Sequence, residues 1–301
     1  MKRRYFIKTT SASALFLGAP SLGFSLFSDK PRKHITILHT NDVHSHIDPF
    51  ESNAWKKANK GGVARRAAVI NKIREENPNT LLLDAGDIFQ GTPYFNFYGG
   101  ALELKLMSLM KYDAGTIGNH EFDNGIDGLL APLHHAKFDL INSNYDFSNT
   151  VMNGHTKPYQ IFEKGGVKIG VFGLGVQLEG LVTKSAYKET VYLDPIEIAQ
   201  DMSKLLKHEK HCDLVICLSH LGYEYTKTDQ VSDVKIAQNT KDIDLIIGGH
   251  THTFLEKPTE IENAIGKTVL VNQVGCHGLY LGRVDFYLEE SQKNNGESLS
   301  I

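Results

Sequence analysis

The sequence contains little cysteine. Its 301 residues include only Cys212, Cys217 and Cys276, at irregular spacing and without a CxxC pair. Three cysteines at such positions do not make a disulfide framework, and the missing CxxC pair argues against a thiolate zinc site. We therefore interpret these residues as small, buried hydrophobic side chains.

The sequence also lacks an excess of positive charge. Its net charge is −3, and its first 28 residues carry four basic side chains and no acidic one. Without that stretch the net charge would fall by four, to −7. Nonspecific nucleic-acid binding depends on neutralising phosphates with lysine and arginine. The composition therefore argues against nucleic acid as a partner.

A long, strongly apolar run is absent as well. A membrane-spanning helix needs about 20 consecutive apolar residues. Residues 9–28 are uncharged, but they contain Pro20 and are rich in serine, threonine and glycine. We therefore expect no stable membrane span once the N-terminal segment is removed.

The N-terminal segment is instead typical of an export signal. The basic run RRYFIK, which begins at Arg3, precedes the uncharged stretch and resembles the twin-arginine signal of bacteria. We predict that residues 1–30 are a signal peptide and that the mature protein is periplasmic or exported. A generic basic signal start or a retained N-terminal anchor stays open, and no clear cleavage site precedes residue 30.

After residue 33, apolar β-branched runs alternate with segments of helical spacing. Strands are predicted at 34–39, 80–87, 114–120, 138–144, 167–175, 212–220 and 242–252, and helices at 61–77, 97–112, 125–136 and 194–211. This alternation predicts an α/β fold with a largely parallel sheet. The runs at 267–275 and 280–289 are expected to form a closing β pair. We place one domain at 31–288 and a polar, disordered tail at 289–301.

Five clusters of polar residues follow apolar strands along the chain. They read HTNDVHSH after the first strand, DAGDIFQG after the second, GNHEFDNG after the third, SHLG after a later one and GGHTH after the last parallel strand. Ligands of open α/β sheets bind outside the carboxyl ends of the strands. We therefore expect these clusters to converge in space although they are far apart in sequence.

The side chains in these clusters are typical of a metal centre. Asp42 and His44, and likewise His250 and His252, are two residues apart, which can aim both side chains one way as a strand ends. Imidazole, carboxylate and amide groups form a mixed nitrogen and oxygen set that suits Zn²⁺, Mn²⁺ or Fe²⁺. They are too many for one ion, whereas two divalent ions that share one bridging carboxylate fit the number.

These motifs together resemble the calcineurin-like metallophosphoesterases. ILHTNDVHSH, GDIFQGTPY, GNHEFDNG and IIGGHTH are similar to the 5′-nucleotidase branch of that superfamily. The resemblance implies a four-layer α/β/β/α sandwich of two mixed β-sheets flanked by helices, and a catalytic pair of His120 and Asp123. It also implies seven metal ligands: Asp42, His44 and His252 on one ion, Asn119, His220 and His250 on the other, and Asp87 as the bridge.

Neighbouring residues of the loop that follows Gly118 are expected to have different roles. Two ions would polarise the phosphoryl group and lower the pKa of a bound water, which gives a hydroxide nucleophile. His120, as an imidazolium, would protonate the leaving group, and Asp123 would orient its ring. Glu121 is expected to anchor the loop through backbone contacts. Asn41 could hold either substrate or a nearby loop. His46 lies near the site but is not expected to be a ligand, and His277 is expected to have no partners in a cluster.

The expected substrate is a small-molecule phosphoester, and a nucleotide under the 5′-nucleotidase interpretation. Members of that branch usually carry a C-terminal domain that binds the nucleoside, whereas this sequence stops at Ile301. A phosphodiesterase or a sugar-nucleotide hydrolase stays open, because the same centre serves monoesters and diesters. A catalytic subunit that needs a separate substrate-recognition protein stays open too.

Overall fold

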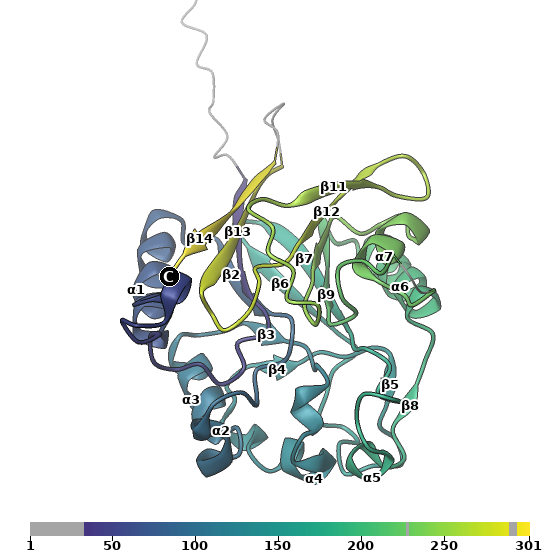
Figure 1. The fold of residues 1–301 in the computed structure, drawn as a ribbon. Coiled ribbons are helices and arrows are strands. Elements are labelled where there is room, and N and C mark those ends of the chain that lie inside the picture. The colour runs from purple at the N-terminus through teal and green to yellow at the C-terminus, as the bar shows by residue number, and fades with distance from the viewer. Residues whose placement is uncertain (1–32, 227–228, 289–293) are drawn as a thin grey trace, which may run out of the picture. The chain divides into compact units, whose positions relative to one another are not determined.

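Two six-stranded β-sheets stack face to face, and helices cover their outer faces (Figure 1). The structure is a computed structural model that describes residues 33–226, 229–288 and 294–301. The predicted signal peptide at 1–30 lies outside the described residues. Residues 32–301 form one compact unit. In the part of the chain that is described, no helix is long and apolar enough to cross a membrane.

The first sheet has the strand order β14-β13-β1-β2-β3-β4. Strands β1 to β4 are parallel, whereas β13 is antiparallel to β1 and β14 is antiparallel to β13. The bounds of these strands are β1 His34–Thr40, β2 Thr80–Asp84, β3 Ala114–Gly115, β4 Asp139–Leu140, β13 Tyr280–Tyr287 and β14 Asn295–Ser300.

The second sheet has the order β11-β12-β10-β9-β7-β6, with four central parallel strands and an antiparallel strand at each edge. A separate two-stranded ribbon joins β5 to β8. The bounds are β5 Tyr145–Asp146, β6 Tyr159–Lys164, β7 Val167–Leu174, β8 Val191–Tyr192, β9 Leu214–Ser219, β10 Leu245–Ile247, β11 Thr259–Glu262 and β12 Thr268–Asn272.

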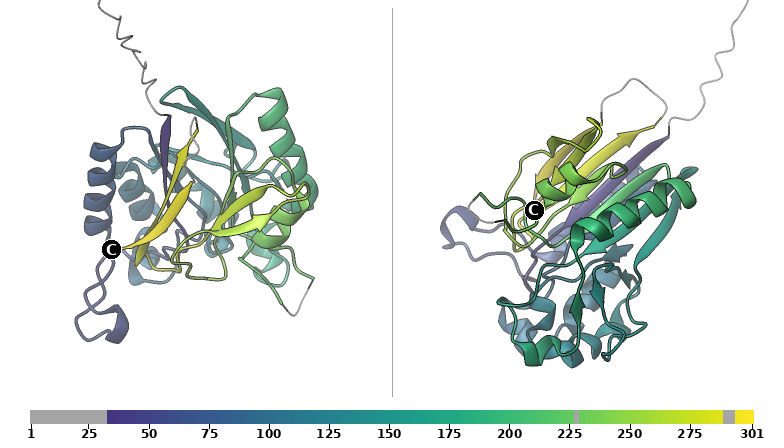
Figure 2. Two further views of the ribbon diagram at one scale, coloured as in Figure 1. Left: turned by 90° about the horizontal axis from the view of Figure 1, so that it is seen from above. Right: turned by 90° about the vertical axis from the view of Figure 1, so that its right-hand side faces the viewer.

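The helices lie on both outer faces, with α1 on one side of the stacked sheets and α6 and α7 on the other (Figures 1 and 2). The α-helices are α1 Val63–Glu76, α2 Pro93–Tyr98, α3 Ala101–Leu109, α4 Gly125–Leu130, α5 Lys184–Tyr187, α6 Pro195–Lys204 and α7 Asp233–Asn239. Short 3-10 helices are η1 Trp55–Lys57, η2 His120–Phe122 and η3 Leu133–His135, and a π-helix, η4 Leu205–Glu209, extends α6. Asp194 caps α6 by accepting hydrogen bonds from two backbone N–H groups, as its place before Pro195 suggests.

Alternation along the strands creates the layers. Successive side chains of a strand point to opposite faces. On β2, Leu81 and Leu83 face the second sheet, whereas Leu82 packs toward the helices of the first. On β10, Leu245 and Ile247 face the first sheet, and Ile246 packs toward α7. The result is one hydrophobic core between the sheets and one beneath each helical layer, which confirms the predicted four-layer sandwich.

Two predictions about the C-terminal part are wrong. The runs at 267–275 and 280–289 do not pair, because β12 belongs to the second sheet and β13 to the first. The tail that we expected to be disordered contains β14, which pairs with β13, and the side chain of Ile301 is buried. The ladder of β14 uses backbone groups, so polar side chains do not prevent it from forming. The compact unit therefore extends beyond residue 288.

Candidate metal centre

The carboxyl ends of five parallel strands bring the predicted ligands together. Asp42 follows β1, Asp87 follows β2 and Asn119 follows β3, all in the first sheet. His220 follows β9, and His250 and His252 follow β10, in the second sheet. The expected convergence is confirmed, and all seven predicted ligands take part in it.

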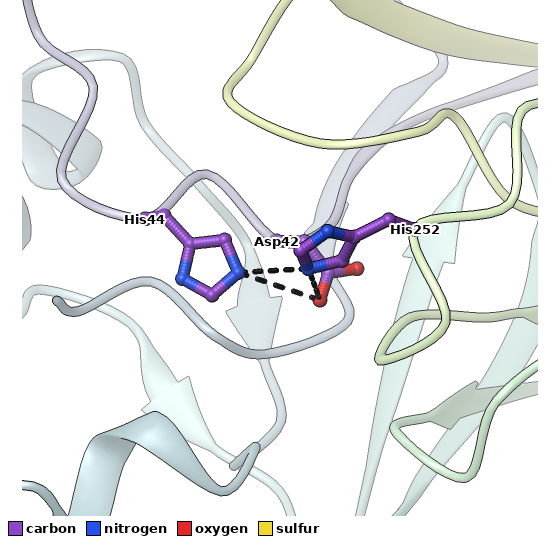
Figure 3. A group of neighbouring side chains, drawn as sticks. All are labelled: Asp42, His44 and His252. Atoms are coloured by element: carbon purple, nitrogen blue, oxygen red, sulfur yellow. Dashed lines mark hydrogen bonds and ion pairs between the residues drawn. The ribbon is translucent and has the colours of Figure 1, made fainter. Parts of the chain in front are cut away.

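One group consists of Asp42, His44 and His252 (Figure 3). The Nε2 atoms of the two histidines are 2.9 Å apart. His252 Nε2 lies 3.3 Å from Asp42 Oδ1, and His44 Nε2 lies 3.9 Å from the same oxygen. Three donor atoms from two sheets thus face one point.

A second group consists of Asp87, His220 and His250. His220 Nε2 lies 3.1 Å from Asp87 Oδ2, and Asn119 Oδ1 lies 2.8 Å from His250 Nδ1. His220 Nδ1 lies 2.7 Å from the carbonyl oxygen of Ala85, which fixes the ring with Nε2 directed into the site. This second group therefore offers carboxylate, imidazole and amide donors at one place.

Asp87 lies between the two groups. Its Oδ2 is 3.1 Å from His220 Nε2 and 3.9 Å from His44 Nε2. Its Oδ1 accepts a hydrogen bond of 2.9 Å from the backbone N–H of His120. This carboxylate therefore lies within 4 Å of a histidine of each group.

The backbone of the ligand loops adopts a costly conformation. Five of the seven side chains sit on left-handed backbone: Asp42 with φ 49°, His44 with φ 50°, Asp87 with φ 54°, His250 with φ 72° and His252 with φ 51°. Each such residue costs of order 1 kcal/mol and persists only where the surroundings enforce it. Backbone hydrogen bonds from Asp42 N to Gly86 O and from His44 N to Asp87 O hold the first two loops together.

Gly86 lets those loops approach. Its φ is +89°, and a Cβ atom there would lie 2.7 Å from the backbone nitrogen of Gly118. A side chain at residue 86 would therefore separate the Asp87 loop from the Asn119 loop.

The ionisation of the cluster fits a cation site. Burial lowers the pKa of His220, but the charge of Asp87 outweighs it and raises that pKa to about 10. A hydrogen bond to Asp42 raises the pKa of His252 to about 10, whereas burial lowers the pKa of His250 to about 4. In the absence of a metal ion, Asp87 and Asp42 thus favour the protonated forms of His220 and His252, and metal binding would displace those protons.

The orientation of His220 supports the same conclusion. Its Nε2 is fully buried and makes no hydrogen bond of normal geometry, although it lies beside Asp87. A buried polar atom without a hydrogen-bond partner is uncommon and requires an explanation. A bound divalent cation would give this nitrogen a partner, and the mixed donor set is the kind that zinc, manganese and iron accept.

His120 and Asp123 form a hydrogen-bonded pair at the edge of the centre. The distance from His120 Nδ1 to Asp123 Oδ2 is 2.8 Å, and about a third of each side chain is exposed. The hydrogen bond that the His120 ring donates to Asp123 is the main cause that raises the pKa of His120 above its ordinary value. The His120 ring lies 5.1 Å from the ring of His44, and its donor atoms also group with His44 and Asp87. Geometry therefore permits His120 either to meet a substrate or to contact a cation.

Glu121 anchors the loop, as expected. Its Oε2 accepts hydrogen bonds from the backbone N–H groups of Asp87 and Gly118, and its Oε1 accepts them from those of Ile88 and Phe89. The side chain is 1% exposed. One buried carboxylate thus ties the loop after β2 to the loop after β3.

Asn41 holds a loop. Its Nδ2 donates to the carbonyl oxygen of Gly275 and to Asp42 Oδ2, and its Oδ1 accepts from the backbone N–H of Val274. Of the two roles considered for Asn41, the structure shows this one.

The expectation that His277 has no partners in a cluster is wrong. Its ring lies 5.9 Å from the ring of His44 and 6.2 Å from that of His252. Its ring also lies 4.1 Å from the ring of His46, so both histidines belong to the surroundings of the site. The position of His277 near the site could have been predicted. Its segment follows the parallel strand β12, just as the other polar clusters follow their strands.

Comparison with known proteins identifies the family. A model of the family described as calcineurin-like phosphoesterase matches residues 35–254. The chain belongs to the calcineurin-like phosphoesterase family. This confirms the predicted family and fold, and the relatives of the chain include 5′-nucleotidases.

Several similar proteins are longer than this phosphoesterase. The trifunctional nucleotide phosphoesterase protein YfkN of Bacillus subtilis is 34% identical over 288 residues, which is 85% of this chain and 18% of that protein. Human 5′-nucleotidase is 33% identical over 291 residues, which is 90% of this chain and 49% of that protein. A 5′-nucleotidase precursor from Thermus thermophilus superposes with a TM-score of 0.81 at 34% identity, over 89% of this chain and 54% of that one. The chain thus spans about half the length of such relatives, or less.

Proposed function

We propose that this chain is a dinuclear, metal-dependent phosphoester hydrolase, similar to the 5′-nucleotidases. The observation that carries the proposal is the position of Asp87 between two groups of metal-type donors. One ion would be held by Asp42, His44 and His252 and the other by Asn119, His220 and His250, with Asp87 shared. Mn²⁺, Zn²⁺ and Fe²⁺ all suit this donor set.

The ions would supply the charge that binds and polarises an anionic phosphoryl group and activates water. The protein residues position them. Asn119 is a neutral amide, so it fills a coordination position without adding negative charge against the anionic substrate. Glu121 sets the relative position of the Asp87 and Asn119 loops through its four hydrogen bonds.

His120 is proposed as the general acid. Its hydrogen bond with Asp123 favours the protonated imidazolium and fixes the ring. An imidazolium in this place donates a proton to the leaving oxygen and stabilises the negative charge of the transition state. Asp123 acts through His120 and is a positioning residue.

The substrate is proposed to be a nucleotide, because the relatives named above are nucleotide phosphoesterases and 5′-nucleotidases. We also propose that the protein is exported across the bacterial membrane, because residues 1–30 resemble a signal peptide. A separate substrate-recognition subunit is a further proposal, which gel filtration and a pull-down from the host would test. A fully active monomer would count against that subunit.

Metal-dependent turnover tests the main proposal. p-Nitrophenyl phosphate and bis-p-nitrophenyl phosphate should be assayed with added Mn²⁺ or Zn²⁺, and metal content measured by mass spectrometry. Asp87→Asn should lower both metal content and turnover, because it removes the shared charged ligand. Asp127→Asn, in an exposed ion pair with Lys188, is the matched control. No hydrolysis of either ester, with unchanged metal content in Asp87→Asn, contradicts the proposal.

A further inference from the structure

The side chain of Gln273 is fully buried against the loop that follows β10. Gln273 follows β12, which is parallel to β10, so both strands end at the same edge of the second sheet. Its Nε2 donates a hydrogen bond of 2.6 Å to the carbonyl oxygen of Gly249. Its Oε1 accepts two more, one from the backbone N–H of Thr253 and one of 3.1 Å from the Thr251 hydroxyl. We call these three bonds the Gln273 clamp, and they span the loop 249–253.

The loop inside the clamp has a backbone conformation that needs support. His250 has a φ of 72° and His252 a φ of 51°, so both residues are left-handed. Such a conformation is costly for residues other than glycine and persists only where the surroundings enforce it. A loop that is released would therefore return these residues to negative φ. That change would turn the two imidazole rings away from their present directions.

The loop has other contacts, which do not replace the clamp. The backbone N–H of Gly248 donates to the carbonyl oxygen of Asn272 over 2.8 Å, which holds the start of the loop. The backbone N–H of His250 donates to the carboxylate of Asp42, which is itself a proposed metal ligand. Gln273 is not one of the proposed ligands, so its three bonds would be the same with and without metal ions.

The loop supplies one ligand to each proposed ion. His250 groups with Asp87 and His220, whereas His252 groups with Asp42 and His44. Both ion sites therefore require the same conformation of one short loop. If the loop relaxes, each site lacks a histidine at the same time.

We propose that Gln273 orders the loop 249–253 before metal binds, and thereby sets the affinity for the first of the two ions. This rests on the proposed dinuclear centre. An ion that binds a protein whose competent state is only partly populated has its apparent affinity reduced by that fraction. The first ion to bind would order a relaxed loop at its own cost, and the second ion would then meet a loop that is already ordered. Gln273 acts through the loop and is a positioning residue.

A metal titration tests this inference without measuring catalysis. The metal-free full chain competes with a chromophoric chelator for Zn²⁺ or Mn²⁺, which gives two stepwise dissociation constants. Gln273→Met removes all three bonds of the clamp at a similar side-chain volume. The first constant should rise about 10- to 100-fold, the usual effect of losing a residue that supports a metal ligand. The second constant should stay close to its wild-type value.

Gln200→Met is the matched control. Gln200 is an exposed glutamine of α6, and its Nε2 also donates to a backbone carbonyl oxygen, that of Asn239. This variant should keep both dissociation constants. Thr251→Val is a second test variant, because it removes one of the three bonds and leaves Gln273 in place. It should raise the first constant by less than Gln273→Met does, and it replaces that variant if circular dichroism shows Gln273→Met to be unfolded.

An unchanged first constant in the folded test variant overturns the inference. An equal rise in both constants also overturns it, because the first ion would then not order the loop for the second. So does a rise of the same size in Gln200→Met, since the effect would not depend on the clamp. If the wild type does not bind two ions per chain, the dinuclear centre and with it the proposed function fail first, which distinguishes the two failures.

Discussion

Replacing Glu121 by glutamine should strongly destabilise the protein. The two carboxylate oxygens accept four backbone N–H groups, two each. An amide keeps one accepting oxygen and puts an NH₂ group in place of the other. Whichever way the amide turns, two buried backbone N–H groups then face a donor instead of an acceptor.

The expected loss of unfolding free energy follows from these two N–H groups. A buried donor left without a partner costs about 1–3 kcal/mol, so two of them cost about 2–6 kcal/mol. This is a large part of the roughly 5–15 kcal/mol that stabilises a typical domain. The loops of Asp87 and Asn119 share this carboxylate, so the variant should also bind metal more weakly.

Urea unfolding of the metal-free protein, followed by far-UV circular dichroism, measures the change. Glu189→Gln is a suitable control, because Glu189 is exposed. The midpoint of Glu121→Gln should fall at an unchanged slope, whereas the control should stay within about 0.5 kcal/mol of the wild type. If Glu121→Gln also stays within that limit, the hydrogen bonds of Glu121 do not have the role assigned to them.

Two further predictions concern the catalytic pair. His120→Asn should keep the metal content and lower turnover by about 10²–10⁴-fold, because it removes the general acid; loss of metal, measured by mass spectrometry, would make His120 a ligand instead. Asp123→Asn should lower the pKa of His120, since the hydrogen bond that His120 donates to Asp123 is the main cause that raises it. The protonated form of His120 is the active one, so activity is lost as pH rises through this pKa, and in a pH–rate profile the alkaline limb should move to lower pH. An unmoved limb would show that Asp123 does not control the proton.

The convergence of the site could be predicted because it depends on a simple rule. Parallel strands end at one edge, and Asp42, Asp87, Asn119, His220 and His250 all follow such strands. The division of the strands between two sheets could not be predicted. An apolar run such as Thr268–Asn272 has the same pattern in either sheet, and only the path of the backbone decides which strand it joins.

Other details could not be predicted from the sequence because they depend on backbone contacts. The polar residues of β14 give no hydrophobic signal, yet their N–H and C=O groups pair with β13. The left-handed backbone of Asp42 and His44 could not be predicted from residue type alone: aspartate and histidine adopt it more often than most residues, but glycine is the residue that it favours most. His277 was missed because the run before it, at 267–275, was expected to pair with the run at 280–289 and not to lie parallel to β10.

The origin of the ligands has a mechanical consequence. Asp42 and His44 extend from one sheet and His252 from the other, and the second group likewise combines Asp87 and Asn119 with His220 and His250. Neither proposed ion could be bound by one sheet alone. The centre connects the two sheets of the sandwich. A motion of one sheet relative to the other would therefore disrupt both ion sites together.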